Sequence, residues 1–375
     1  MHAHCSILCI TPPHILREIA RNGTPAQQEV AQRTLLTSAS LQAKRSSMGG
    51  RLAASLRAIV VGGKDRTVYD AKNGTSLPGV KVRGEGDPAS LDPAVNEAYD
   101  GSGITYDLYL NAFGRNSIDN NGLKLNSTVH YQKGYDNAFW DGEQMVYGDG
   151  DEDLPVSERL FNRFTKSLDV IAHELTHGVT QYEANLNYFA QPGALNESMS
   201  DVFGSLVKQY QRAQTADAAD WIIGEGLFTE NVNGVGIRSM KAPGTAYDDP
   251  VLGKDPQPSH MRDYVNTIED NGGVHINSGI PNHAFYVVAR ELGGFAWEKA
   301  GAIWYKALTD KLQSTSSFAD AANLTFQAAT ELYGSGSLEE QAVKTGWTEV
   351  GIDIGVPSEN EGCFTSVMRA IGFIK

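Results

Sequence analysis

The feature that most constrains this chain is a pair of histidines placed one helical turn apart inside a helix-like stretch. His173 and His177 stand in the segment Asp-Val-Ile-Ala-His-Glu-Leu-Thr-His, which begins at Asp169. Two side chains four positions apart on a helix project from the same face, so both imidazoles can reach one metal ion. Glu174 lies beside them, where it can act on a water molecule at that metal. The spacing therefore predicts a metal site carried by a helix, although two histidines alone can also be ordinary surface residues.

A second segment supplies the missing ligand. Twenty residues after His177 comes Asn196-Glu197-Ser-Met-Ser-Asp201, again with a spacing of one helical turn. Glu197 completes a set of two histidines and one glutamate for Zn²⁺ and leaves the fourth position open for water. Asp201 is placed to accept the N–H of a ligating histidine and so to fix its tautomer. These acids could instead decorate a solvated helix face, but the preceding motif favours the zinc site.

The distribution of residue types along the sequence predicts an α+β fold with two lobes. Between residues 57 and 150, β-branched and aromatic runs alternate with Gly, Asn and Asp, which is typical of strands and turns. From residue 161 onward, a 3.6-residue apolar period dominates instead. We expect strands near 66–70, 128–131 and 144–147, and helices at 93–113, 161–183, 194–213, 280–292, 297–312 and 317–333. A cleft between the lobes is the expected place for chemistry.

Residues 1–50 differ from the rest in charge. They carry five basic and two acidic residues, a net charge of +3, so the remainder carries −17 of the total of −14. A basic leader could dock on an acidic body, or its few charges could be solvated surface. Thr24-Pro25-Ala26-Gln27 predicts the start of a helix. The basic and then glycine-rich stretch 44–50 is interpreted as a linker open to a protease, or as an ordinary exposed loop.

Charge and composition exclude several classes of protein. The net charge of −14 argues against nucleic acid or an anionic membrane as partner. No stretch approaches 18 apolar residues, so we expect no membrane span. The apolar run at 6–10 lacks a basic region before it and a cleavage pattern after it, so it is not a classical signal peptide. Cys5, Cys9 and Cys363 leave the middle of the chain without a disulfide, which fits either a secreted or a cytosolic protein.

Taken together, these motifs resemble the thermolysin-like neutral zinc metalloproteases. The resemblance covers about residues 64–352 and includes further motifs at 136–142, 145–151, 188, 236–240 and 270–279. The leader segment Pro12-Pro13-His14-Ile15-Leu16 resembles the protealysin-like branch, whose pro-segments are short. This implies a pro-segment at 1–50, a β-rich lobe with the zinc helix at 51–185 and a helical lobe at 186–352. The tail at 353–375 receives no functional interpretation, and we expect a monomer.

The resemblance also implies a role for each site residue. Glu174 would be the general base and then the acid, and His275 and Tyr188 would donate to the developing oxyanion, with Asp270 orienting His275. Residues gripping the peptide backbone would be Arg238, Asn137, Ala138 and Trp140. The pocket just after the scissile bond would be lined by Val170, Ile223, Leu227 and Ile237, closed by Phe161 or Phe164, and would suit Leu, Ile or Phe. Taken singly, each of these residue types is more often structural.

One part of the family pattern is altered. Family members usually bind two calcium ions beside the zinc helix, and the matching positions here keep Asp169, Asp220 and Glu225. Lys208 and Ile222 replace two expected acids. Because Ca²⁺ takes six to eight oxygen ligands, we expect the double site to be lost, with Lys208 paired to the remaining carboxylates and at most a reduced calcium site.

The function expected from the sequence is a zinc endopeptidase, secreted or released and made latent by its leader. The leader would block the cleft sterically; a Cys5 or Cys9 thiolate on zinc is the alternative, but that device belongs to other zinc peptidase families. Cleavage is expected between residues 46 and 58. A zinc aminopeptidase and a zinc-stabilised binding module remain open, although the first lacks an evident acidic subsite for a free amine. The second would predict loss of Glu174 or His275, and both are present. Cytoplasmic retention also stays open.

Overall fold

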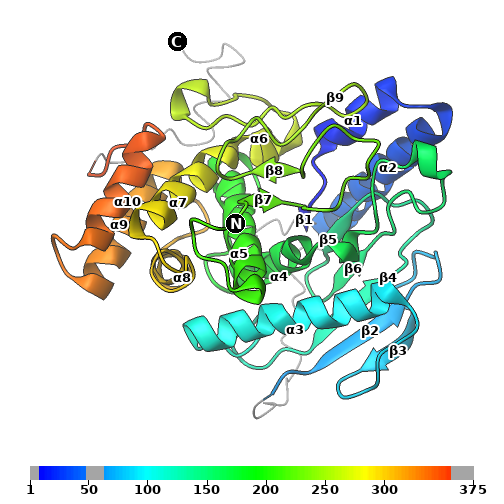
Figure 1. Ribbon diagram of the computed structural model, residues 1–375, viewed down its shortest axis with the longest axis horizontal. Coiled ribbons are helices and arrows are strands. Elements are labelled where there is room, and N and C mark those ends of the chain that lie inside the picture. The colour runs from blue at the N-terminus through cyan, green and yellow to red at the C-terminus, as the bar shows by residue number, and fades with distance from the viewer. Residues whose placement is uncertain (1–7, 48–62, 356–375) are drawn as a thin grey trace.

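The computed structural model describes residues 8–47 and 63–355 of the 375-residue chain (Figure 1). Within them, a sheet-containing N-terminal part adjoins a C-terminal part built mainly of helices. This confirms the predicted two-lobed α+β fold. None of the helices in the described ranges is long and apolar enough to cross a membrane.

The leader contributes one short strand and two helices. These are β1 (Leu8–Cys9), α1 (Pro13–Asn22) and α2 (Pro25–Ser47). The α2 start is the predicted one, because the Gln27 side chain accepts from the Thr24 N–H (2.7 Å) while the Thr24 hydroxyl accepts from the Gln27 N–H (3.4 Å). The prediction of a linker from residue 44 is wrong at its beginning, since α2 continues to Ser47. The rest of that linker and the expected cleavage window from 48 onward lie outside the described residues.

A six-stranded sheet forms the N-terminal lobe, in the order β1-β5-β6-β4-β2-β3. The β2/β4 and β4/β6 pairs are parallel and the others antiparallel, so the leader strand β1 is an edge strand on β5. The remaining strands are β2 (Arg66–Asp70), β3 (Val80–Gly84), β4 (Leu125–Val129), β5 (Ala138–Trp140) and β6 (Met145–Tyr147). The helix predicted at 93–113 is α3 (Pro93–Phe113), which begins at an Asp92 cap and packs against this sheet.

Two boundaries in this lobe differ from the predictions. The strand predicted to reach residue 131 ends at Val129, because His130 (φ 53°) and Gln132 (φ 51°) adopt left-handed conformations that a strand cannot contain. The helix predicted from residue 161 begins only at Leu168. Two 3₁₀ turns (Val156–Glu158 and Phe164–Lys166) precede it, and Phe161 forms an isolated bridge with Phe228.

The zinc-motif helix α4 (Leu168–Tyr182) packs on α5 (Ala190–Arg212), which leads into the helical lobe. That lobe also contains two helices that periodicity did not predict, α6 and α10. Its helices are α6 (Asp270–Asn277), α7 (Gly279–Leu292), α8 (Ala300–Asp310), α9 (Phe318–Tyr333) and α10 (Leu338–Glu349). Short elements complete it: β7 (Ile222–Ile223) with β8 (Arg238–Ser239), β9 (Asp248–Asp249) with β10 (Gly253–Lys254), and a 3₁₀ turn at Met261–Asp263.

One apolar core joins the two lobes and includes the leader. Ile10, Ile15, Leu16 and Ile19 of the leader are at most 1% exposed and belong to the same cluster as α4, α5 and the helical lobe. The leader is therefore packed as part of the folded body.

Candidate active site

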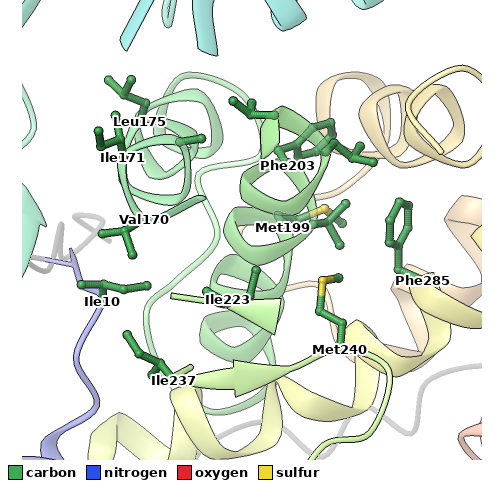
Figure 2. Close-up of a cluster of buried hydrophobic side chains, with 14 of the residues drawn as sticks. Ile10, Val170, Ile171, Leu175, Met199, Phe203, Ile223, Ile237, Met240 and Phe285 are labelled. Atoms are coloured by element: carbon green, nitrogen blue, oxygen red, sulfur yellow. The ribbon is translucent and has the colours of Figure 1, made fainter. Parts of the chain in front are cut away.

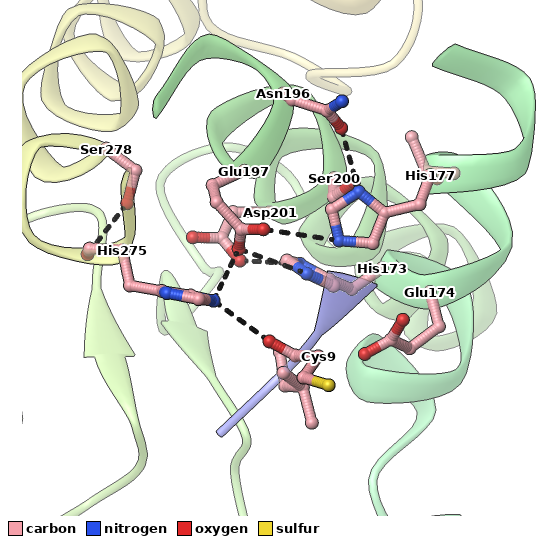
Figure 3. A network of polar contacts seen from close by, with 12 residues as sticks. Cys9, His173, Glu174, His177, Asn196, Glu197, Ser200, Asp201, His275 and Ser278 are labelled. Carbon is pink, nitrogen blue, oxygen red and sulfur yellow. Dashed lines mark hydrogen bonds and ion pairs between the residues drawn. The ribbon is translucent and has the colours of Figure 1, made fainter. Parts of the chain in front are cut away.

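The close approach of α4 and α5 positions the metal-binding side chains. From residue 169 to 180, every α4 side chain is buried. Gly204 on α5 permits the approach, because a Cβ there would lie 2.7 Å from the Asp169 carbonyl oxygen. The crossing brings His173 and His177 of α4 opposite Glu197 of α5 (Figure 3).

Among the described residues, His173, His177 and Glu197 form a group fit to hold a metal ion, with one ligand atom from each lying within 4.8 Å of the others. The Nε2 atoms of His173 and His177 lie 3.5 and 3.4 Å from the Glu197 carboxylate, and all three side chains are fully buried. Both Nε2 atoms and Glu197 Oε2 lack a hydrogen-bond partner. Buried polar atoms are almost always paired, so this converging set fits Zn²⁺, which prefers such nitrogen and oxygen ligands.

The other ring nitrogens fix the tautomers that zinc binding needs. His173 Nδ1 lies 2.8 Å from Asp201 Oδ1, and His177 Nδ1 lies 2.8 Å from Asn196 Oδ1 and 2.9 Å from Ser200 Oγ. A carboxylate or amide oxygen only accepts, so each Nδ1 carries the proton and each Nε2 keeps its lone pair for a metal. Burial lowers the pKa of His177 to about 3, which keeps this imidazole neutral. Neither Asn196 nor Ser200 was predicted to have this role, although both lie on α5 within one turn of Glu197.

Glu174 lies beside the metal-binding group. Its Oε2 accepts from the Trp140 N–H (3.0 Å), whereas its buried Oε1 has no partner. Burial raises the pKa of Glu174 well above its ordinary value, and the negative charge of Glu197 raises it further. The carboxylate is thus anchored through one oxygen and has the other available. The Trp140 N–H is used by Glu174, while the Trp140 backbone also pairs with Leu8 of the leader.

An unusual backbone run orients His275. Asp270, Asn271, Gly272 and Gly273 all have positive φ (51°, 51°, 83° and 76°), which folds the Asp270 side chain back over the start of α6. Asp270 then accepts from both the His275 N–H (2.9 Å) and Nδ1 (2.6 Å). Burial lowers the pKa of His275, but the carboxylates of Asp270 and Glu197 outweigh this effect and raise it to about 9. His275 is therefore a charged donor.

Tyr188 lies between Glu197 and His275. Its hydroxyl donates to Glu197 Oε1 and lies 3.2 Å from His275 Nε2. The structure thus gathers Tyr188 and Asp270 at His275. His275 and Glu174 lie on opposite sides of the metal-binding group (Figure 3).

The leader crosses this centre as an added strand. Leu8 pairs with Trp140 and Cys9 with Phe139 in an antiparallel register. His275 Nε2 lies 2.9 Å from the Cys9 carbonyl oxygen (Figure 3). The backbone of the next two residues makes three further contacts. The Ile10 N–H donates to the Ala138 carbonyl (3.2 Å), and the Ile10 carbonyl accepts from Arg238 Nη1 (3.2 Å). The Thr11 N–H donates to Asn137 Oδ1 (2.9 Å). The leader occupies the edge where the sequence predicts a peptide substrate.

The Ile10 side chain is fully buried in the apolar cluster that contains Val170, Ile223 and Ile237 (Figure 2). Leu227 is buried in the same core cluster. Phe161 and Phe164 stack on each other, with ring centroids 5.9 Å apart, and Phe161 also contacts Phe228.

The Cys9 thiol packs away from the ligand set. Burial raises the pKa of this thiol well above its ordinary value, and the negative charge of Glu174 raises it further. Cys9 is not a member of the metal-binding group. This geometry favours a neutral thiol over a zinc-bound thiolate; Cys5 lies outside the described residues.

The expected calcium ligands gather around Lys208. Its Nζ lies 2.9 Å from Asp169, 2.9 Å from Asp220 and 3.7 Å from Glu225, and it also donates to the Ile222 carbonyl. The ammonium is 3% exposed, so a fixed positive charge stands among these carboxylates.

Comparison with known proteins agrees with this geometry. The family model described as the thermolysin metallopeptidase catalytic domain matches residues 40–181, and the one described as its alpha-helical domain matches 184–352. An extracellular metalloprotease of Pectobacterium carotovorum is 51% identical over 354 residues (93% of this chain, 97% of that protein). Protease PrtS of Photorhabdus sp. is 48% identical over 349 residues, 92% of each chain.

A solved structure shows the same fold. The precursor of protealysin, a metalloproteinase from Serratia proteamaculans, matches with a TM-score of 0.82 and 52% identity, covering 92% of this chain and 99% of that one. The chain therefore belongs to the thermolysin family of zinc metallopeptidases, in its protealysin-like branch.

Proposed function

We propose that this metallopeptidase is an endopeptidase made as a latent precursor, with residues 1 to about 50 as its inhibitor. One observation carries the proposal: the leader pairs with β5 through Leu8 and Cys9 and continues along it with bonds from the Ile10 and Thr11 N–H groups, while the Cys9 carbonyl is held by His275. A chain that continues on both sides of this carbonyl supports cleavage inside a peptide rather than at its end.

Glu174 acts as base and then as acid. Zinc, when held by His173, His177 and Glu197, would polarise a carbonyl and lower the pKa of water. The free Oε1 of Glu174 takes a proton from the attacking water, while Oε2 stays fixed by the Trp140 N–H. Glu174 then passes that proton to the amine that leaves as the peptide bond breaks.

His275 and Tyr188 stabilise the charge that develops on the carbonyl oxygen. The position of the Cys9 carbonyl, 2.9 Å from His275 Nε2, supports this role. Arg238 grips the carbonyl of the residue after the scissile bond, as it does with Ile10. Asn137 and the Ala138 carbonyl hold the backbone N–H groups on that side.

Substrate preference follows from the pocket that holds Ile10. Val170, Ile223 and Ile237 present aliphatic groups, and the site takes a branched side chain completely out of water. We therefore assign a preference for Leu, Ile or Phe just after the scissile bond.

Latency is steric, and apolar burial contributes most to leader docking. Ile10, Ile15, Leu16 and Ile19 share one buried cluster with the body, and fully burying such a side chain contributes roughly 1.5–3 kcal/mol, although α2 of the leader buries part of the α1 face. The Arg17–Glu269 pair (2.7 Å) joins the leader to the body, but its partners are 38% and 69% exposed. Such a pair contributes about 0–1 kcal/mol. The leader's net positive charge is thus secondary to its apolar face.

Two further properties belong to this proposal. Lys208 replaces calcium in the carboxylate cluster, so activity depends on zinc alone. The protein acts outside the cell, as the name of its Pectobacterium relative suggests.

Internally quenched peptides with both ends blocked test the proposed activity. After leader removal, the enzyme should cut such peptides before Leu, Ile or Phe, lose activity with a chelator and regain it with zinc. An aminopeptidase would require a peptide with a free amino terminus. A zinc-stabilised binding module would cut neither blocked peptides nor peptides with a free amino terminus.

A further inference from the structure

Asp201 accepts hydrogen bonds from other side chains besides His173, the zinc-binding residue that it orients. His173 Nδ1 and Arg238 Nη2 each lie 2.8 Å from its Oδ1. Arg238 Nε and Asn282 Nδ2 each lie 2.8 Å from its Oδ2. All four side chains are fully buried or nearly so. One carboxylate on α5 thus receives donors from α4, β8 and α7.

The amide of Asn282 has only one orientation that fits this site. Asp201 forms a buried ion pair with Arg238, whose Nε and Nη2 each lie 2.8 Å from one of its carboxylate oxygens. The ionised carboxylate only accepts hydrogen bonds, so the atom of Asn282 that faces it must be the NH₂ group.

Rotation of the Asp201 carboxylate would disturb two functions at once. Its Oδ1 bonds a zinc ligand, and both of its oxygens bond Arg238, whose Nη1 grips the carbonyl after the scissile bond. Asn282 holds the oxygen that faces away from His173. We propose that Asn282, some 80 positions beyond Asp201, is a positioning residue that locks this carboxylate and thereby sets both His173 and Arg238. The inference rests on the proposed function.

Replacing Asn282 by leucine keeps a similar volume and removes the donor. Outer hydrogen bonds of this kind typically change metal affinity by about 10–100-fold. Because three of the four donors to Asp201 remain, we expect the lower end, about 10-fold weaker zinc binding. We also expect a higher KM for blocked peptides, because Arg238 is less well oriented.

Zinc affinity is measured on the full chain by competition with a chromophoric chelator, in a Glu174→Gln background that prevents self-digestion. Thr325→Val is the matched control, since Thr325 is fully buried in the helical lobe and bonds Trp347, outside the Asp201 network. Asn282→Ala, which removes the donor and adds no bulk, serves if the leucine variant does not fold.

The proposal predicts that Asn282→Leu weakens zinc binding about 10-fold, whereas Thr325→Val leaves it unchanged. In an Asp201→Asn background the effect of Asn282→Leu should largely disappear, because the acceptor is altered. Zinc affinity within twofold of the parent in both Asn282 variants would overturn the proposal. A parent protein that binds no zinc would instead overturn the proposed function itself.

Discussion

The Ile10→Ala substitution in the leader gives the sharpest test of latency. Ile10 is fully buried in the pocket beside Val170, Ile223 and Ile237. Truncating a buried isoleucine to alanine typically costs about 2–5 kcal/mol. We take the low end, about 2 kcal/mol, because the emptied pocket opens to water once the leader leaves. At 1.4 kcal/mol per tenfold change, leader docking should weaken about 30-fold.

The assay is the initial rate of blocked-peptide cleavage by the intact precursor. Mass spectrometry before and after the measurement establishes that residues 1–47 are still attached. A precursor that is active only in its undocked fraction should show a basal rate about 30-fold higher with Ile10→Ala. Leu36→Ala removes a similar side chain that is 73% exposed on α2 of the same leader, and it should leave the rate unchanged. Equal basal rates for the two variants would refute the argument that Ile10 anchors the leader in the substrate pocket.

Three other outcomes follow from the structure. His275→Phe should lower kcat on the order of 10²–10³-fold while the zinc content stays the same; a loss of zinc would mean a structural role instead. Lys208→Met should destabilise the protein by about 3 kcal/mol in urea unfolding, because Asp169 and Asp220 lose a buried partner, and wild-type stability should not respond to calcium. Burial lowers the pKa of His14 to about 4 from an ordinary 6.5, so docking strength is complete above pH 6.5 and falls up to tenfold per pH unit toward pH 4. The basal rate of the precursor should therefore rise on acidification, and His14→Gln should show a smaller rise.

The ligand set could be predicted because its spacing is local. His173 and His177 are one turn apart on α4, and Glu197 and Asp201 are one turn apart on α5. Helical geometry alone therefore brings each of these two pairs to one face of its helix. Asn282 could not be found in this way. Its contact with Asp201 exists only because α7 packs on α5, and no sequence period records that packing.

Elements with weak local patterns were also missed. The residues opening α6 have positive φ and resemble a loop in sequence, yet their strained turn is what aims Asp270 at His275. The leader strand β1 has two residues, too few for an alternation to show. The charge difference between leader and body drew attention to docking, but the leader is held by buried apolar side chains and by hydrogen bonds of its backbone more than by ion pairs.

The central claim is that Glu174 performs the chemistry at a zinc site built by three other residues. The most direct measurement compares Ile10→Ala with Ile10→Ala/Glu174→Gln, in which the leader is loosened equally, for bound zinc and for blocked-peptide turnover. The account predicts one zinc per chain in both proteins, with turnover nearly abolished in the second. On prolonged incubation, well after the initial rate is measured, that protein should also keep its full length, whereas the first shortens by about 5 kDa, for roughly 50 residues at ordinary composition. Undiminished turnover in the zinc-loaded double variant would contradict the account.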